Sequence, residues 1–198
     1  MNEEYLMKAK ARLQGMYKDL SANVTLIYQR IPLHLAYDLV MHSVVGFTFK
    51  GERLERGWVE GMVVGDTRVG KSRVARELGK HYHGARLVNC ERVSFAGLVG
   101  GMSQVGKGWN INWGMIPLND RRGITADETT GLSVGQIGEM SGMRSSGVAE
   151  IIKIQQERTR ARCRIMWLSN VRSEYNRRIS SYGYGVQTIP EIMGRAED

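Results

Sequence analysis

The sequence predicts a three-layer α/β fold with a mostly parallel sheet, built as a single domain. Short apolar runs typical of buried strands alternate with helix-like segments along the chain. A glycine-rich motif at residues 65–72 joins the first of these strands to a helix, and an acidic pair at 127–128 follows a later strand. The 198 residues suit one domain. Within it we expect an N-terminal helical segment over 1–50 and the core over 51–198.

The N-terminal part of the chain has helical periodicity. Apolar side chains recur at three- and four-residue steps, among them Leu6, Leu13 and Leu20. Pro32 stands where a second helix can begin, ahead of Leu35. We therefore expect helices before the first strand.

Strands and helices alternate from residue 58 onward. The apolar run 59–64 ends at Gly65 and is typical of a buried parallel strand, and a helix is expected from Ser72 to about His81. The later elements expected in chain order are a strand at 86–90, a glycine-rich loop at 97–108, an apolar segment at 115–118, a strand at 124–126, a polar region up to 147, hairpin arms at 148–154 and 158–164, and a strand at 165–168. This order favours helices on both faces of a parallel sheet.

Composition excludes several classes of protein. With 42% hydrophobic and 24% charged residues, the chain is neither disordered nor collagen-like. No apolar run reaches the roughly 18–20 residues that span a bilayer, and the N-terminus is acidic where a secretory signal would be basic. Cys90 and Cys163 belong to no CxxC or Cys/His cluster, which disfavours a disulfide framework and a structural zinc site. We expect a cytoplasmic protein with reduced, buried thiols and no membrane partner.

The strongest functional signal is a phosphate-binding loop (P-loop) sequence between an expected strand and an expected helix. The pattern G-x-x-x-x-G-K-[ST] is satisfied by Gly65, Asp66, Thr67, Arg68, Val69, Gly70, Lys71 and Ser72. Backbone N–H groups of such a loop, and the helix that follows, attract phosphate oxygens. Lys71 would reach the β- and γ-phosphates, and the Ser72 hydroxyl would bind Mg²⁺. The motif therefore predicts a site for ATP and Mg²⁺.

Polar residues follow two of the later strands. Asp127 and Glu128 come after the strand at 124–126, and Asn170 comes after the strand at 165–168. One carboxylate can hold Mg²⁺, while its neighbour orients and deprotonates a water molecule. We expect the Asn170 strand beside the P-loop strand, where an amide at the γ-phosphate can position the attacking water. The combination predicts ATP hydrolysis rather than phosphoryl transfer to a small acceptor.

The formal net charge of +8 is concentrated in one segment. Residues 153–178 contain eight basic and two acidic side chains. Arg158, Arg160, Arg162 and Arg164 alternate with uncharged residues, so in a strand all four guanidinium groups would emerge on one face. Such a row suits the phosphate backbone of DNA. A solvated strand face, or pairing with ATP or with acidic groups of a neighbouring subunit, would explain it as well.

With these motifs in this order, the chain resembles the AAA+ ATPase module of minichromosome-maintenance (MCM) replicative helicases, in the divergent form found in phages and mobile elements. The resemblance covers nearly the whole chain. The similar segments are helical stretches at 20–28 and 34–40, the P-loop, a glycine-leucine stretch at 97–101, the stretch 109–114, and a strand pair at 114–120 and 123–128 that leads into the Walker B motif. The resemblance implies replication of a viral or mobile genome in a prokaryotic cytoplasm.

The resemblance also implies roles for single residues. Asp127 becomes the Mg²⁺-associated Walker B aspartate, Glu128 the water-activating glutamate and Asn170 sensor 1. Arg195 resembles the arginine finger that completes the ATP site of the adjacent subunit, which implies a homo-oligomeric ring. Lys153 falls close to the lysine at the tip of the pre-sensor-1 β-hairpin, which touches DNA in the family. The predicted DNA contacts are therefore Lys153, Arg158, Arg160 and Arg162.

The chain departs from the family pattern in three places. Residues 67–69 stand where the cellular family has smaller, proline-bearing residues, and 129–131 replace an aromatic residue and an acid after Glu128. The chain stops three residues after Arg195, so we expect an AAA+ core without its C-terminal lid. A small P-loop nucleotide or metabolite kinase and a non-catalytic, DNA-binding regulatory fragment are the alternatives. Glu128 next to Asp127 argues against the kinase.

Overall fold

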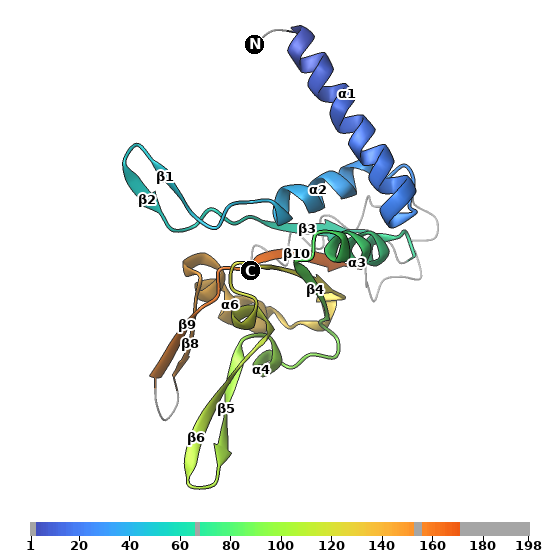
Figure 1. The fold of residues 1–198 in the computed structure, drawn as a ribbon. Coiled ribbons are helices and arrows are strands. Elements are labelled where there is room, and N and C mark those ends of the chain that lie inside the picture. Colours follow the sequence, from blue (N-terminus) through green and yellow to red (C-terminus); the bar gives the residue numbers. More distant parts are fainter. Residues whose placement is uncertain (1–2, 66–67, 153–155, 171–198) are drawn as a thin grey trace.

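The centre of the molecule is a four-stranded parallel sheet (Figure 1). The computed structural model describes residues 3–65, 68–152 and 156–170. The sheet consists of β3 (Glu60–Val64), β10 (Arg164–Ser169), β7 (Gly123–Asp127) and β4 (Ala85–Asn89), in that spatial order. The α/β class and the parallel sheet predicted from the sequence are confirmed.

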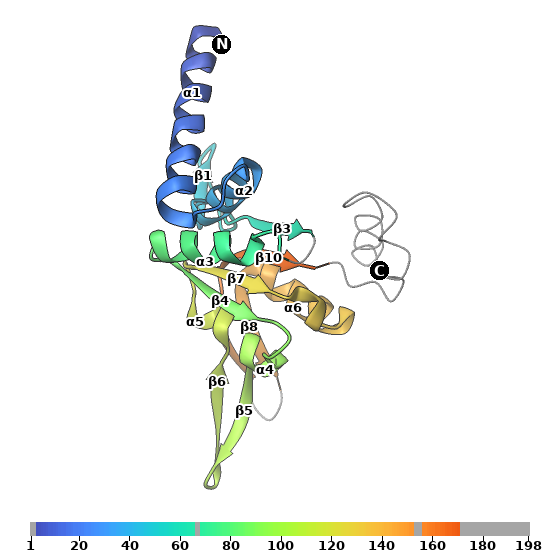
Figure 2. The same cartoon turned by 90° about the vertical axis from the view of Figure 1, so that its right-hand side faces the viewer.

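Two long helices and one end of a third pack on one face of the sheet, and three further helices lie on the other (Figures 1 and 2). The first group is α1 (Glu3–Leu20), α2 (Ile31–Met41) and α3 (Lys71–His81). The second group is α4 (Phe95–Leu98), α5 (Met115–Leu118) and α6 (Val134–Ser146). Short turns of other helical types are η1 (Ser21–Thr25) and η2 (Thr129–Gly131). The arrangement is compatible with the expected three layers.

Strand β10 shows why both faces of the sheet are covered. Ile165 and Trp167 belong to the core shared with α4, α5 and α6, while Met166 and Leu168 belong to the core shared with α1, α2 and α3. Successive side chains of a strand point to opposite faces, and every residue of β10 after Arg164 is buried. A strand that is apolar on both faces needs a layer of helices on each side.

Three antiparallel hairpins extend from this body (Figure 1). They are β1 (Phe47–Phe49) with β2 (Glu52–Leu54), β5 (Gly100–Val105) with β6 (Gly108–Trp113), and β8 (Val148–Ile152) with β9 (Gln156–Arg160). A hairpin at 148–164 was predicted from the sequence, but its second arm, β9, ends at Arg160 rather than at residue 164. The glycine-rich stretch predicted as a loop at 97–108 instead contains the end of α4, all of β5 and the first residue of β6.

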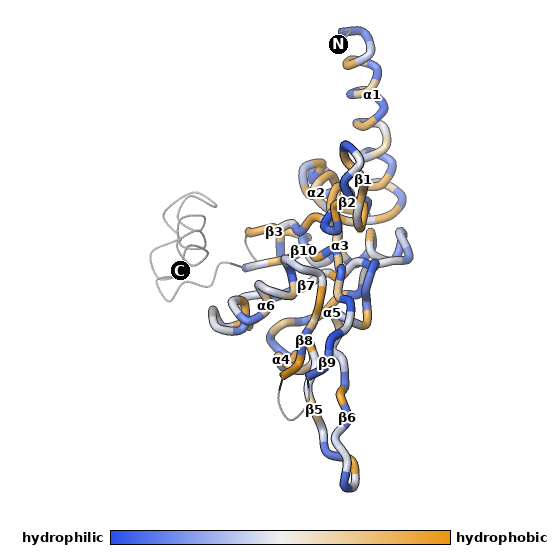
Figure 3. The backbone as a smooth tube through the Cα atoms, turned by 90° about the vertical axis from the view of Figure 1, so that its left-hand side faces the viewer, coloured by the Kyte–Doolittle hydropathy of each residue, from blue (hydrophilic) through white to orange (hydrophobic). Residues whose placement is uncertain are grey.

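Helix α1 projects from the body with one end packed against it. Tyr17 and Leu20 are buried, whereas Leu6 and Leu13 remain 44% and 48% exposed. Hydrophobic and hydrophilic residues alternate along the helix (Figure 3), which agrees with the periodicity in the sequence. Pro32 lies in the first turn of α2, as predicted.

Three other expectations need correction. The strand at 59–64 is the edge strand β3 and is only partly buried, with Met62 55% exposed. The segment 115–118, expected as part of a strand pair, is the short helix α5, because a brief apolar run carries no period that separates strand from helix. The polar region before residue 147 contains helix α6.

Helix α6 forms although its sequence is rich in glycine and serine, which are weak helix formers. Ser133 and Gln136 make a reciprocal capping box at its start, with the Ser133 hydroxyl accepting from the Gln136 N–H at 3.2 Å. Met140 and Met143 are buried against the sheet. Tertiary packing and the cap therefore outweigh propensity here. No helix within the described residues is both long enough and apolar enough to cross a membrane.

Candidate functional site

The carboxyl ends of all four parallel strands meet at one edge of the sheet. Gly65 follows β3, Asn170 follows β10 and Glu128 follows β7. Strand β10 lies between β3 and β7, with Ser169 in register with Val64 and Trp167 in register with Ala126. The prediction that the Asn170 strand lies beside the strand of the glycine-rich motif is confirmed. Ligands of open α/β sheets bind at this edge.

The glycine-rich motif links β3 to α3. Gly70 directly precedes α3 and has a φ of +90°, a left-handed conformation that glycine adopts without steric cost. Its neighbour Arg68 is exposed and also left-handed, with a φ of +65°. Val69 is half-buried. Asp66 and Thr67 lie outside the described residues. As predicted, a strand precedes the motif and a helix follows it.

Lys71 is the first residue of α3, and its side chain folds back over the start of the motif. The ammonium Nζ donates a hydrogen bond of 2.7 Å to the carbonyl oxygen of Gly65. Lys71 is 6% exposed, which is low for a lysine. Ser72 follows it in the first turn of α3 and is half-buried. A cationic group and a hydroxyl therefore stand at the helix N-terminus, where anions are favoured.

Asp127 and Glu128 lie where the sequence predicted, at the carboxyl end of β7. Asp127 is the last residue of the strand, and its Oδ1 accepts a hydrogen bond of 3.0 Å from the Glu128 N–H. Glu128 has φ 54° and ψ 49°, a left-handed conformation that is uncommon for a residue other than glycine. Both side chains are half-buried. The turn at Glu128 directs the chain into η2 directly after the strand.

Gly131 closes this turn because the chain passes very near another loop. A Cβ atom on Gly131 would lie 2.7 Å from the Cα of Glu91 and 2.9 Å from the carbonyl oxygen of Cys90. The Cys90 N–H in turn donates to the Asp127 carbonyl oxygen at 2.8 Å. The loops after β4 and β7 are therefore packed together beneath the acidic pair.

Asn170 joins the two central strands through its side chain. Its Nδ2 donates a short hydrogen bond to Oε2 of Glu128, and the residue is 8% exposed. The Ser169 hydroxyl donates to the Asn170 carbonyl oxygen at 3.4 Å. Residues 42 positions apart in the sequence thus place an amide against a carboxylate at the sheet edge.

A hydroxyl and a carboxylate are available here for a metal ion. Ser72 and Asp127 both stand at the carboxyl edge of the sheet. Mg²⁺ usually binds one or two protein oxygens together with substrate phosphates and water, so the donor chemistry of this pair fits Mg²⁺. Among the described residues, no group of three or more His, Cys, Asp or Glu side chains could hold a metal ion.

One contact beneath the site could not be found from the sequence. The hydroxyl groups of Tyr37 in α2 and Thr125 in β7 are hydrogen-bonded at 3.0 Å, and both residues are buried. Burial raises the pKa of Tyr37 to about 12, the hydrogen bond from Thr125 acting in the opposite direction. Thr125 stands two residues before Asp127, so α2 supports the strand that carries the acidic pair.

Neither cysteine has the properties of a reactive thiol. Both are buried and free, as expected from the sequence. Burial raises the pKa of the Cys90 thiol to about 12, and the nearby charge of Asp127 acts in the same direction. Burial likewise raises the pKa of Cys163 to about 12. Reactive cysteines have a lowered pKa, so these two are structural.

The four alternating arginines do not form one row. Strand β9 ends at Arg160, and Arg164 already begins β10. The Arg162 guanidinium is held by Asp120, with Nη2 to Oδ2 at 2.6 Å and Nε to Oδ1 at 3.0 Å. Nε of Arg164 donates to the Ser43 carbonyl oxygen at 2.5 Å. The expectation of a single arginine face was therefore wrong, because the strand breaks between the second and third arginines.

Two of the four arginines remain on the hairpin. Nε of Arg158 donates to Oε1 of Glu150 across the hairpin at 2.7 Å, and Arg160 is exposed. Arg162 has an 11% exposed side chain and a partner within the protein. Lys153, expected at the hairpin tip, and Arg195, expected as the arginine finger, lie outside the described residues.

No model of a known protein family matches the sequence. No curated protein matches it either.

Proposed function

We propose that this chain is the ATP-binding and ATP-hydrolysing core of an MCM-like AAA+ DNA helicase that acts in DNA replication. The observation that supports this most is the meeting of Lys71, Glu128 and Asn170 at one edge of a parallel sheet, with Asn170 hydrogen-bonded to Glu128. The strand between the glycine-rich motif and the acidic pair carries the amide, so the three groups come from three different elements.

The motif at 65–72 would bind the phosphates of ATP. The N-terminus of α3 offers backbone N–H groups, and the ammonium of Lys71 can exchange the Gly65 carbonyl for a phosphate oxygen. When bound with the nucleotide, Mg²⁺ would be held by Ser72 and Asp127 and would neutralise phosphate charge.

Glu128 would act as the general base for hydrolysis. Its carboxylate can accept a proton from a water molecule placed in line with the γ-phosphate. Asn170 touches the same carboxylate and can donate to that water or to a phosphate oxygen. Water itself accepts the phosphoryl group, so Glu128 is the one general base that the reaction requires.

Hydrolysis at subunit interfaces would drive DNA translocation. Under this proposal Arg195 of one subunit completes the site of the next in a homo-oligomeric ring, so a monomer is nearly inactive. DNA would be contacted by Lys153, Arg158 and Arg160 of the β8–β9 hairpin. Arg162 is engaged by Asp120 within the protein, so its charge is largely compensated there.

ATPase activity measured against protein concentration, with and without single-stranded DNA, tests this proposal. We expect specific activity to rise with concentration. Lys71→Ala and Glu128→Gln should each lower kcat at least about 100-fold. Mixing inactive Glu128→Gln subunits with inactive Arg195→Ala subunits should restore part of the activity, since some interfaces then combine an intact Glu128 with an intact Arg195.

Each alternative predicts a different result. Phosphate transfer to a small acceptor, with activity independent of concentration and no rescue on mixing, would identify a kinase. Salt-sensitive DNA binding that survives Lys71→Ala, without ATP turnover at any protein concentration, would identify a non-catalytic DNA-binding fragment.

A further inference from the structure

The amino end of the sheet, opposite the candidate site, carries an arginine-rich loop. Residues 120–122 lead into β7, and their neighbours are the segments that lead into β10 and β4. The Arg121 N–H donates to the Arg162 carbonyl oxygen at 2.8 Å, the Arg164 N–H donates to the Arg122 carbonyl oxygen at 3.0 Å, and the Gly123 N–H donates to Gly84 at 3.0 Å. The loop is thus fixed on both sides by backbone hydrogen bonds.

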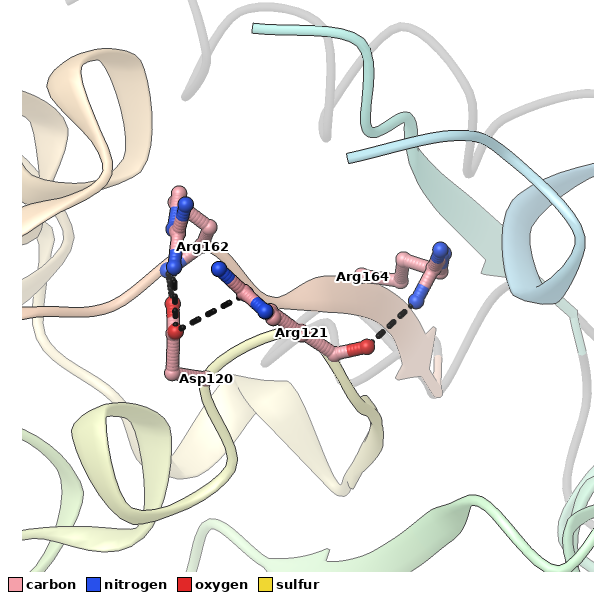
Figure 4. Close-up of polar contacts among 4 residues, drawn as sticks. All are labelled: Asp120, Arg121, Arg162 and Arg164. Atoms are coloured by element: carbon pink, nitrogen blue, oxygen red, sulfur yellow. Dashed lines mark hydrogen bonds and ion pairs between the residues drawn. The ribbon is translucent and has the colours of Figure 1, made fainter. Parts of the chain in front are cut away.

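Asp120 anchors this loop from within. Its carboxylate accepts from the backbone N–H of Arg162 at 2.8 Å and from two guanidinium nitrogens of the same residue. Arg121 lies 3.9 Å from the same carboxylate, which is too far for a hydrogen bond. Figure 4 shows Arg162 facing Asp120, while Arg121 stands between Arg162 and Arg164. Arg162 therefore makes three hydrogen bonds to the Asp120 carboxylate, and Arg121 adds a longer ion pair with it.

The charges around the loop are one-sided. Four arginines (Arg121, Arg122, Arg162 and Arg164) stand around two acids, Asp120 and Glu55, whose charges both act on Arg162, so this group carries a net charge of +2 (four minus two). By contrast, the described part of the β8–β9 hairpin is neutral, because Glu150 and Glu157 balance Arg158 and Arg160. The uncompensated positive charge lies at the amino end of the sheet rather than on the hairpin arms.

Arg121 and Arg122 present this charge to solvent. The side chain of Arg121 is 66% exposed, Arg122 is exposed, and no ion pair to Arg122 occurs among the described residues. Arg86 on the neighbouring β4 is exposed too. Arg121 has a φ of +65°, and its carbonyl oxygen accepts from Nη1 of Arg164 at 2.7 Å. Glycine would adopt that conformation at less cost.

We propose that Arg121 and Arg122, together with Arg86 on the neighbouring strand β4, form a binding surface for the phosphate backbone of single-stranded nucleic acid. Guanidinium groups bind phosphate oxygens through paired hydrogen bonds, and a fixed loop holds two of them close together. The surface rests on the DNA-binding part of the proposed function and extends it. It moves the main backbone contact from the hairpin arms to the loop before β7.

The test is fluorescence anisotropy with a labelled oligothymidylate, carried out on the full chain over a range of salt concentrations. Arg121→Gly combined with Arg122→Ser should weaken binding about tenfold. Because each phosphate contact to a single strand contributes about 0.7 to the salt slope, the slope should fall by about 1.4. The thermal midpoint should equal or exceed that of the wild type, since glycine relieves the positive φ at position 121.

Two matched variants serve as controls. Arg12→Ala with Lys18→Ala removes the same charge from exposed positions of α1, on the other face of the sheet, and should change affinity less than twofold. Arg158→Ala with Arg160→Ala removes the hairpin arginines and should have a smaller effect than the loop variant.

Three other results would overturn the inference, and each of them points to a different cause. Equal affinity of the loop variant and the α1 control would refute the loop surface and leave the proposed function intact. A wild-type protein that binds no DNA would refute the DNA-binding part of the proposed function as well. A loop variant that changes the oligomeric state in light scattering, but not DNA affinity, would show that the loop contacts a second copy of the chain.

Discussion

The Asn170 side chain is the clearest link between two predicted site residues. Its hydrogen bond to Glu128 holds together groups at the ends of β10 and β7. Asn170 is buried, so its amide needs partners at this edge of the sheet. The same amide can serve the water molecule that Glu128 would activate.

We predict that Asn170→Ala lowers kcat for ATP hydrolysis about 100-fold, because the attacking water loses a positioning donor. Affinity for a fluorescent ATP analogue should change less than threefold, since the phosphates are bound by the motif at 65–72. Ser169→Ala is the matched control at the adjacent buried position and should keep most of the activity. Unchanged turnover in Asn170→Ala would show that the amide has only a structural role.

Gly131 illustrates how tightly the loop behind the acidic pair is packed. A methyl group there would meet backbone atoms of Glu91 and Cys90 at less than 3.0 Å. Backbone atoms cannot move aside as a flexible side chain can, so one of the two loops would have to shift.

We predict that Gly131→Ala lowers the free energy of unfolding by about 2 kcal/mol or more. Gly138→Ala makes the same chemical change in α6, where nothing lies within 4 Å of the added methyl group. It should raise the free energy of unfolding by about 0.5–1 kcal/mol, because alanine favours a helix. Urea denaturation monitored by circular dichroism measures both. Equal effects would mean that the approach to Glu91 is not close in solution.

At the scale of elements, the Asp120–Arg162 contact connects the end of the β8–β9 hairpin to the loop before β7. Burial alone would raise the pKa of Asp120, but hydrogen bonds from Arg162, and the charges of Arg162 and Arg121, hold it below its ordinary value. The hydrogen bond to Asp120 correspondingly raises the pKa of Arg162. The pair therefore stabilises the fold while Asp120 is ionised.

We predict that Asp120→Asn lowers the free energy of unfolding by about 2 kcal/mol at neutral pH. A carboxyl whose pKa is lower in the folded than in the unfolded state contributes fully above its unfolded pKa, and this contribution is lost as pH falls through the folded pKa. The difference between wild type and variant should thus be constant above about pH 5 and shrink below about pH 4. Urea denaturation of both proteins at pH values above and below this range measures the difference.

A double-mutant cycle checks the cause. In an Arg162→Met background, Asp120→Asn should cost much less than it does alone, because the partner of the carboxylate is already gone. A cost that stays the same in both backgrounds would mean that Asp120 acts through other groups.

At the scale of the whole molecule, the two proposed binding surfaces lie at opposite ends of the same strands. Lys71, Glu128 and Asn170 stand at the carboxyl edge of the sheet, while Arg121 and Arg122 stand at the amino edge. Strands β7 and β10 run between the two edges, buried on both faces. Substitutions at one edge should therefore be close to additive in stability with substitutions at the other.

Much of the fold could be predicted because it depends on local patterns in the sequence. The apolar runs of β7 and β10, the periodicity of α1 and Pro32 at the start of α2 are all local signals. Asp127 ends a strand, the glycine-rich motif, Glu128 and Asn170 each follow one, and parallel strands end at a common edge. The residues of the candidate site could therefore be named from their position in the chain.

What the sequence by itself determined is the alternation of strands and helices and the polar residues at the strand ends, because both depend on neighbours a few positions apart. Only the tertiary structure decided which arginines are held by hydrogen bonds to an acid and which remain exposed. Arg162 is bound by Asp120, 42 positions away, and Arg121 is turned outward by a left-handed backbone held between Arg162 and Arg164. Whether a charge is compensated depends on long-range contacts, and no local pattern in the sequence encodes those.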